Sequence, residues 1–296
     1  MFVQKYQFSS NSTIEHKDFL QKWESESAEA LSKFEKSDYQ GAYDKFKDLV
    51  QKMTKYLSEN YLDRIQLLSY FASCASHLKK FDEAKEGFLE ALELNKEYNY
   101  NNLTTKAELL LGLGELYQET GQVEQAIDCL ERAKQDFLGE NPPDHLELTG
   151  ILDLLGKSYL QIGKFDQAYE NLKWSYDIQV KTYGEEDIRI VKALSILSIV
   201  TKEQDKIDEC MKYLKKAVQI LNKTDKLPHV RASCLAELAG CFMERGLIDE
   251  AQPLYEEAYG ILVGLYGPDY TEVAMITKHL GIIALRKKRS EEHTSE

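Results

Sequence analysis

The chain is poor in the residues that interrupt helices and in long apolar runs. It contains five prolines and sixteen glycines among 296 residues, too few for long disordered stretches. No apolar run approaches the roughly 20 residues that a membrane-spanning helix needs. Residues 1–6 also lack the basic and then apolar layout of a secretory signal. We therefore expect a cytoplasmic protein, and leave a cytoskeletal or ciliary location open.

Positive charge is also in deficit. The sequence has 37 lysines and arginines against 50 aspartates and glutamates, a formal net charge of −13. Nucleic acids and anionic membranes are bound through basic surfaces. The charge balance therefore argues against both as partners.

Residue groupings that carry chemistry are missing. The five cysteines form no CxxC pair and the six histidines are dispersed. We find no glycine-rich phosphate loop, no His-Glu-x-x-His, no Gly-x-Ser-x-Gly and no EF-hand loop. We expect the cysteines to be small buried side chains in a reducing compartment. The sequence predicts a protein that is not an enzyme, with no catalytic, cofactor or metal site and no small-molecule substrate.

What the sequence has in abundance is self-similarity. One short phrase, such as Phe81-Asp82-Glu83-Ala84 or Phe165-Asp166-Gln167-Ala168, recurs six times. Its last residue is small and recurs at intervals of 42 or 41: Ala42, Ala84, Ala126, Ala168, Cys210 and Ala251. We call these six the marker residues. A fixed period of this length is the signature of stacked supersecondary units.

Each unit reads as two helices joined by a tight turn. Twelve residues before each marker stands another small residue: Ala30, Ala72, Gly114, Gly156, Ser198 and Ala239. Four residues after each marker stands a large apolar one: Phe46, Phe88, Leu130, Leu172, Leu214 and Tyr255. Small residues at these places allow two helices to approach closely where they cross. A glycine such as Gly163 ends the first helix.

These motifs resemble the tetratricopeptide repeat. Its Gly-x-x-x-x-Ala element occurs from Gly121, Gly163 and Gly246, and its Leu-Gly-x-x-Tyr element from Leu113 and Leu155. The long period and the linker phrases Tyr183-Gly184-Glu185-Glu186-Asp187 and Tyr266-Gly267-Pro268-Asp269 are similar to kinesin light chain. The resemblance implies an all-α fold, a right-handed superhelical α-solenoid of stacked antiparallel helix pairs.

One feature of kinesin light chain is absent. Its first helices carry paired asparagines that bind cargo peptides, whereas Asp153-Leu154 and Ser195-Ile196 stand at two of the corresponding positions here. The sequence therefore argues against a kinesin cargo role.

Three segments follow from the repeat boundaries. Residues 1–16 read as an irregular N-terminal segment, and 17–288 as six helix pairs plus the first helix of a seventh. In that last helix we expect an apolar strip to face water. Residues 289–296 resemble the translation of a sequencing adapter, so we expect them to be non-native and the natural protein to continue with a second helix; an ordinary polar tail is the alternative.

Stacks of this kind are binding scaffolds more often than enzymes. The leading hypothesis is a scaffold that binds a protein or peptide segment in a concave groove lined by the first helices. Helical spacing assigns nine side chains to this groove: Glu115, Glu119, Asp153, Lys157, Gln161, Lys192, Ser195, Lys202 and Glu203. The alternative is a permanent structural subunit of a large ciliary, transport or organellar assembly.

Overall fold

The computed structural model describes residues 14–56, 61–97 and 102–294. All regular structure within these ranges is helical. No helix among them combines the length and apolar character required to cross a membrane. In chain order the helices are α1 (Ile14–Glu35), α2 (Tyr39–Tyr56), α3 (Tyr61–His77), α4 (Phe81–Glu97), α5 (Leu103–Glu119), α6 (Val123–Glu140), α7 (Leu148–Gln161), α8 (Phe165–Tyr183), the 3₁₀ helix η1 (Ile188–Ile190), α9 (Val191–Glu203), α10 (Ile207–Leu221), α11 (Pro228–Glu244), α12 (Ile248–Tyr266) and α13 (Thr271–Thr294).

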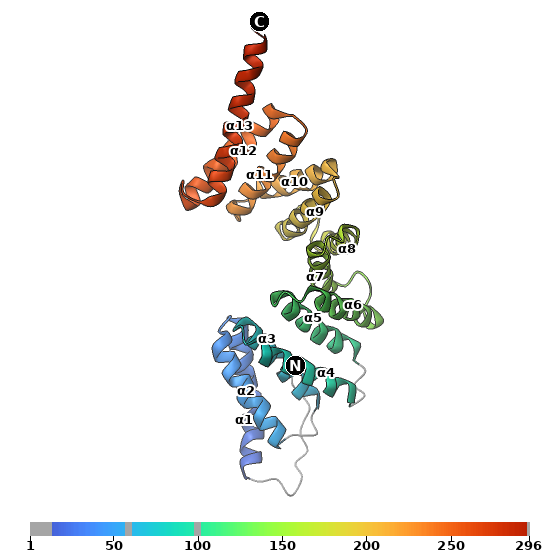
Figure 1. The fold of residues 1–296 in the computed structure, drawn as a ribbon. Coiled ribbons are helices and arrows are strands. Elements are labelled where there is room, and N and C mark those ends of the chain that lie inside the picture. Colours follow the sequence, from blue (N-terminus) through green and yellow to red (C-terminus); the bar gives the residue numbers. More distant parts are fainter. Residues whose placement is uncertain (1–13, 57–60, 98–101, 295–296) are drawn as a thin grey trace. The chain divides into compact units, whose positions relative to one another are not determined.

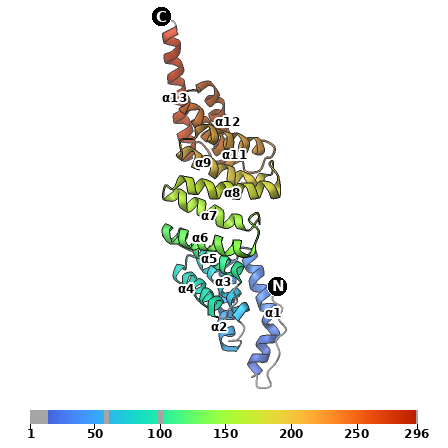
Figure 2. The same ribbon diagram turned by 90° about the vertical axis from the view of Figure 1, so that its right-hand side faces the viewer.

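The helices form two compact units, Met1–Pro143 and Asp144–Glu296. The first stacks three helix pairs, α1 to α6, and the second stacks α7 to α12 followed by the unpaired α13 (Figure 1). Within a pair the two helices lie side by side, as α7 and α8 do in Figure 2. The all-α stack of antiparallel helix pairs expected from the sequence is confirmed.

The turn inside each pair has one backbone conformation. The residue five before the marker has a positive φ of 58 to 75° in all six pairs: Ser37, Lys79, Gly121, Gly163, Asp205 and Gly246. The following N–H donates back to the last turn of the first helix, as from Gln122 to the Tyr117 carbonyl at 2.8 Å. Such bonds satisfy carbonyls that the helix end leaves open. Glycine adopts this conformation freely, whereas other residues are strained in it.

The helices of a pair cross where the sequence places its small residues. All six markers are at most 1% exposed. A Cβ atom added to Gly114 would lie 2.7 Å from Leu130 Cγ, and one added to Gly156 would lie 2.3 Å from Leu172 Cγ. The space left by each glycine is therefore filled by the large residue four positions after the marker.

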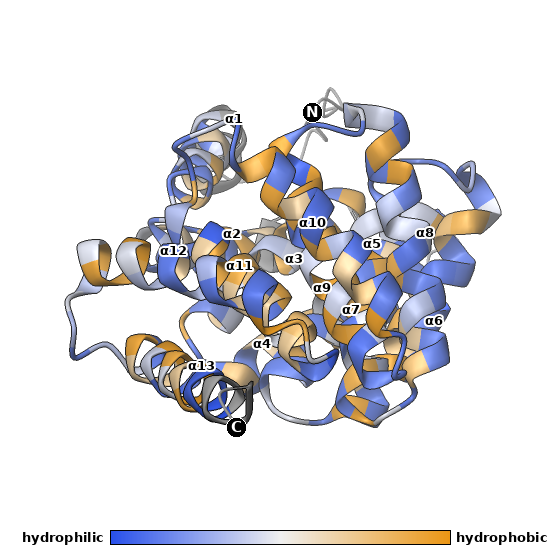
Figure 3. Cartoon of the chain, turned by 90° about the horizontal axis from the view of Figure 1, so that it is seen from above, coloured by the Kyte–Doolittle hydropathy of each residue, from blue (hydrophilic) through white to orange (hydrophobic). Residues whose placement is uncertain are grey.

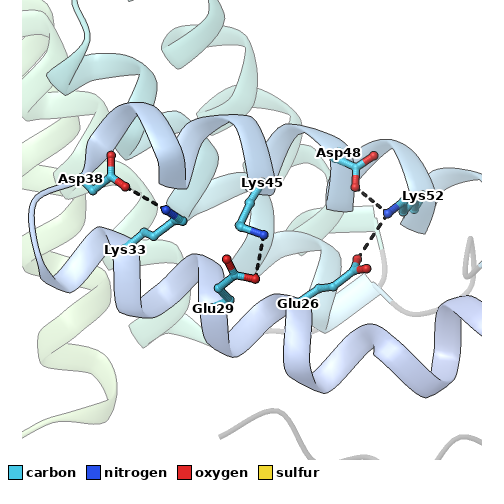
Figure 4. A network of polar contacts seen from close by, with 7 residues as sticks. All are labelled: Glu26, Glu29, Lys33, Asp38, Lys45, Asp48 and Lys52. Carbon is cyan, nitrogen blue, oxygen red and sulfur yellow. Dashed lines mark hydrogen bonds and ion pairs between the residues drawn. The ribbon is translucent and has the colours of Figure 1, made fainter.

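The first pair carries a charged face. Lys45 Nζ lies 2.8 Å from Glu29 Oε2, and Lys52 Nζ lies 3.3 Å from Glu26 Oε2, which joins α1 to α2 (Figure 4). Elsewhere on α1, Trp23 is 1% exposed. Because exposed ion pairs contribute little stability, we attribute more of the stability of this pair to buried side chains such as Trp23. The helix begins at Ile14, so 14–16 are not irregular as expected, and 1–13 lie outside the described residues.

The five cysteines, as expected, are buried and unbridged: Cys74, Cys129, Cys210, Cys234 and Cys241. Burial raises the pKa of the Cys74 thiol to about 12. A buried thiol with a raised pKa is unreactive. Cys74 therefore serves as a small apolar side chain in the core.

Helix α13 packs one apolar side against the preceding helix pair. Large apolar residues of α13 are only 1 to 3% exposed and pack with Tyr255 and Leu262 of α12: Val273, Ile276 and Ile283. The sequence predicts that the inner side of this helix packs on the preceding pair, led by Tyr255 and Ala258, and that an apolar strip on its outer side faces water. The three buried residues form that packed inner side. Along α13, Figure 3 shows both hydrophobic and hydrophilic residues. The large apolar side chains that do face water are Met275 and Leu285.

Helix α13 is also longer than the repeat predicts. The pattern indicates an end near Lys288, but the helix runs to Thr294. No glycine or proline follows Gly281, so nothing in the local sequence ends the helix. The adapter origin of residues 289–296 stays a prediction.

The strained turns generate a first prediction. Replacing Lys79, whose φ is 58°, by glycine removes left-handed strain, and Lys79→Gly should stabilise the protein by about 1 kcal/mol. The reciprocal Gly121→Lys should destabilise it by about 1 kcal/mol, since nothing lies within 4 Å of an added Cβ there and only the φ of 75° matters. Urea denaturation of wild type and both variants measures these changes in the free energy of unfolding. Equal midpoints for all three proteins would contradict the strain.

The helix crossing generates a second prediction. Gly156→Ala places a methyl group against Leu172 and should cost about 1–3 kcal/mol. Gly281 occupies the same repeat position in α13, but nothing lies within 4 Å of its added Cβ. Gly281→Ala should therefore stabilise the protein, by about 0.5–1 kcal/mol from helix propensity alone. Thermal melting compares the two; a shift of the same sign in both would contradict the packing argument.

Candidate functional site

The groove positions follow the repeat register. The residue directly after the small first-helix position is Glu115 in α5, Lys157 in α7, Ile199 in α9 and Gly240 in α11. Four residues later come Glu119, Gln161, Glu203 and Glu244. Side chains at these positions are half-buried or exposed in the structure. They are therefore at least partly open to solvent.

In the first unit the predicted groove contributes two carboxylates. Glu115 and Glu119 both lie on α5 and are exposed. Ser76 of α3 donates its hydroxyl to Glu119 Oε2 at 3.4 Å. This part of the surface is acidic and crosses two successive first helices.

In the second unit three predicted residues come together. Asp153 is half-buried on α7, and Lys157 of the same helix and Lys192 of α9 are near enough to act on its charge. Burial is the largest influence and raises the pKa of the Asp153 carboxyl, while a hydrogen bond from Ser175 and the two lysines lower it. Asp153 Oδ1 is buried without a hydrogen bond. Exposed Lys192 completes a patch of mixed charge.

The remaining predicted residues divide into three kinds. Gln161 and Glu203 are exposed at the ends of α7 and α9. Ser195 is half-buried and donates its hydroxyl to the Val191 carbonyl at 3.0 Å, so its own helix already uses that group. Lys202 stands apart from the mixed-charge patch. Its Nζ lies 3.5 Å from a carboxylate oxygen of each of two α11 residues, Glu237 and Glu244.

Lys202 lines a cavity of about 520 Å³ within the second unit. The deep part of this cavity is formed by Tyr255, Leu262 and Ile276, each at most 3% exposed. Carboxylates stand exposed at its edge: Glu237, Glu244 and Glu272. We call this the α9–α11–α13 cavity. Its volume falls within the range of small-molecule and side-chain pockets.

The cavity exists because two groove positions on α11 are small. Ala236 and Gly240 line it, where α7 has Asp153 and Lys157 and α9 has Ser195 and Ile199. Sequence reasoning missed these residues because it selected charged and polar side chains. The signal was present, since Gly240 follows Ile199 by one 41-residue period.

Two aromatic rings fix one wall. Tyr255 of α12 and His279 of α13 stack with ring centroids 5.1 Å apart and planes 4° from parallel. Desolvation, aided by Glu237, raises the pKa of Tyr255 to about 12, so its hydroxyl keeps its proton at neutral pH. Met243 and Met275 also line the cavity. Methionine side chains adapt to differently shaped ligands.

Sequence comparison agrees with the repeat. The tetratricopeptide repeat family model matches residues 63–136 and 105–179. The chain is 24% identical over 206 residues to Protein KINESIN LIGHT CHAIN-RELATED 2 of Arabidopsis thaliana. The aligned region covers 69% of this chain and 31% of that protein. The chain is also 29% identical over 132 residues to BBSome complex member BBS4 of Bos taurus, covering 40% and 22%. The chain thus spans about a third or less of the length of these relatives.

Solved structures share the fold. BtubC (BKLC) from P. vanneervenii superposes with a TM-score of 0.67 at 15% identity, covering 77% of this chain and 92% of that one. YrrB, described as a TPR protein with an unusual peptide-binding site, superposes with a TM-score of 0.55 at 17% identity, covering 76% and 97%. The family match and these solved structures show that the chain shares the fold of tetratricopeptide-repeat proteins and is similar to kinesin light chain-related proteins.

Proposed function

We propose that the protein is a protein-interaction scaffold that binds an extended or helical segment of a partner along the first helices of its repeats. The observation that carries this proposal is that groove side chains reach solvent, since Lys157 is half-buried and Lys192 is exposed. Stacked repeats typically present such a surface for binding. The structural relative YrrB, described as having a peptide-binding site, supports the same reading.

The mixed-charge patch suits a partner with charges of both signs. Asp153 is half-buried and Lys192 is exposed. Exposed charges steer and select a partner more than they add affinity. We therefore expect the patch to decide which segment binds, and apolar contacts elsewhere on the surface to supply most of the affinity.

A permanent subunit of a large assembly is the second candidate. The similarity to BBS4, named as a member of a complex, favours it. In that case convex and end surfaces would carry the contacts instead of the groove. Size-exclusion chromatography of native extract separates the two, because a subunit elutes as a discrete high-mass peak and a scaffold mostly as free monomer.

Charge reversal at the patch tests the groove. The double variant Lys157→Glu/Lys192→Glu should lose partners that wild-type protein retains in a pull-down, by at least about tenfold if two charge pairs of the strength seen at interfaces are reversed. The matched control is Lys212→Glu/Lys226→Glu. It makes the same change in net charge at two exposed lysines away from the first-helix positions. Unchanged partners in the first variant, or equal losses in both, would remove the groove assignment.

The buried carboxyl gives a pH prediction. Because burial raises the pKa of Asp153, the charged form destabilises the fold at neutral pH, and this cost fades as pH falls through the raised pKa. Asp153→Asn should therefore melt at a higher temperature than wild type at pH 7. The difference should shrink toward pH 4. A difference that is constant with pH would show that the carboxyl's charge is not the cause.

A further inference from the structure

The α9–α11–α13 cavity has a chemical character distinct from the mixed-charge patch. Its depth is apolar, with Leu262 and Ile276 nearly inaccessible, and Met275 at its edge is 58% exposed. Exposed methionine beside an apolar hollow is typical of surfaces that accept apolar side chains. A volume of about 520 Å³ exceeds what one large side chain fills, so a short stretch of chain fits as well.

The cavity edge is acidic. Glu237, Glu244 and Glu272 are exposed there, and Lys202 is the single lysine or arginine among the lining residues. That lysine is shared, since its Nζ lies 3.5 Å from carboxylate oxygens of both Glu237 and Glu244. One ammonium group cannot balance three carboxylates. The edge keeps an excess of negative charge that a bound cation would offset.

We infer that this cavity receives a partner segment in which a large apolar side chain stands next to a lysine or arginine. The apolar side chain enters between Met243 and Met275, against the stacked rings of Tyr255 and His279. The neighbouring cation lies among the glutamates of the edge. The inference rests on the proposed scaffold function and adds the chemistry of the segment that is bound.

Gly240 offers a way to close the cavity without disturbing the helix crossing. A Cβ atom added there meets Tyr255 Oη at 3.6 Å, an ordinary contact. Gly240→Phe therefore directs a ring into the cavity. Gly260 on α12 is an exposed helical glycine with nothing within 4 Å of an added Cβ. Gly260→Phe is the matched control for helix propensity and added hydrophobicity.

The test is selection of heptapeptides from a phage-displayed random library on the full chain. Binding of the selected peptides is then measured by fluorescence anisotropy. We expect a consensus in which an apolar residue adjoins lysine or arginine. Gly240→Phe should weaken these peptides at least about tenfold, with Gly260→Phe unchanged. Glu272→Lys should weaken them as well, and Glu250→Lys, at an exposed position of α12 outside the cavity, should not.

Several results would overturn the inference. They are a consensus with acidic neighbours, the absence of any consensus, or undiminished binding to a Gly240→Phe protein whose circular dichroism matches wild type. A failure of the cavity inference can be distinguished from a failure of the proposed scaffold function. If Lys157→Glu/Lys192→Glu loses partners while Gly240→Phe keeps them all, the groove stands and the cavity does not contribute.

Discussion

The close crossing of two helices inside each repeat is the constraint on which the rest of the structure depends. At Gly156 there is no room for even one carbon, because Leu172 already fills that space. Because the interior is close-packed, a larger side chain at this crossing would displace the neighbouring helices as well. Fixing the crossing fixes which face of each helix is buried, and therefore which faces remain for binding. The groove positions are the residues of the first helices that face away from the crossing.

The turn between the helices serves the same crossing. A left-handed residue reverses the chain within a few residues, and the bond from Gln122 to the Tyr117 carbonyl closes the first helix. Lysine and aspartate occupy this conformation at Lys79 and Asp205, although glycine suits it better. The geometry of the pair is thus kept where the local sequence disfavours it, since packing on both sides outweighs a strain of about 1 kcal/mol.

The groove positions vary from repeat to repeat without breaking the crossing. The groove position holds Lys157 in one repeat and Gly240 in another. The first puts charge on the surface, and the second opens the α9–α11–α13 cavity over an unchanged helix pair. The surface chemistry of such a stack can therefore change by single substitutions while the helix crossing is kept.

The sequence by itself determined the period, the helix pairs, the turns and the crossing, because each depends on residues at fixed short separations within one repeat. It also placed Asp153, Lys157 and Lys192 on one surface. Only the tertiary structure decided that Lys202 pairs with α11 carboxylates, and that small residues on α11 open a cavity. Burial and cavities depend on how much of a surface the neighbouring helices cover, and a period in the sequence does not measure that coverage.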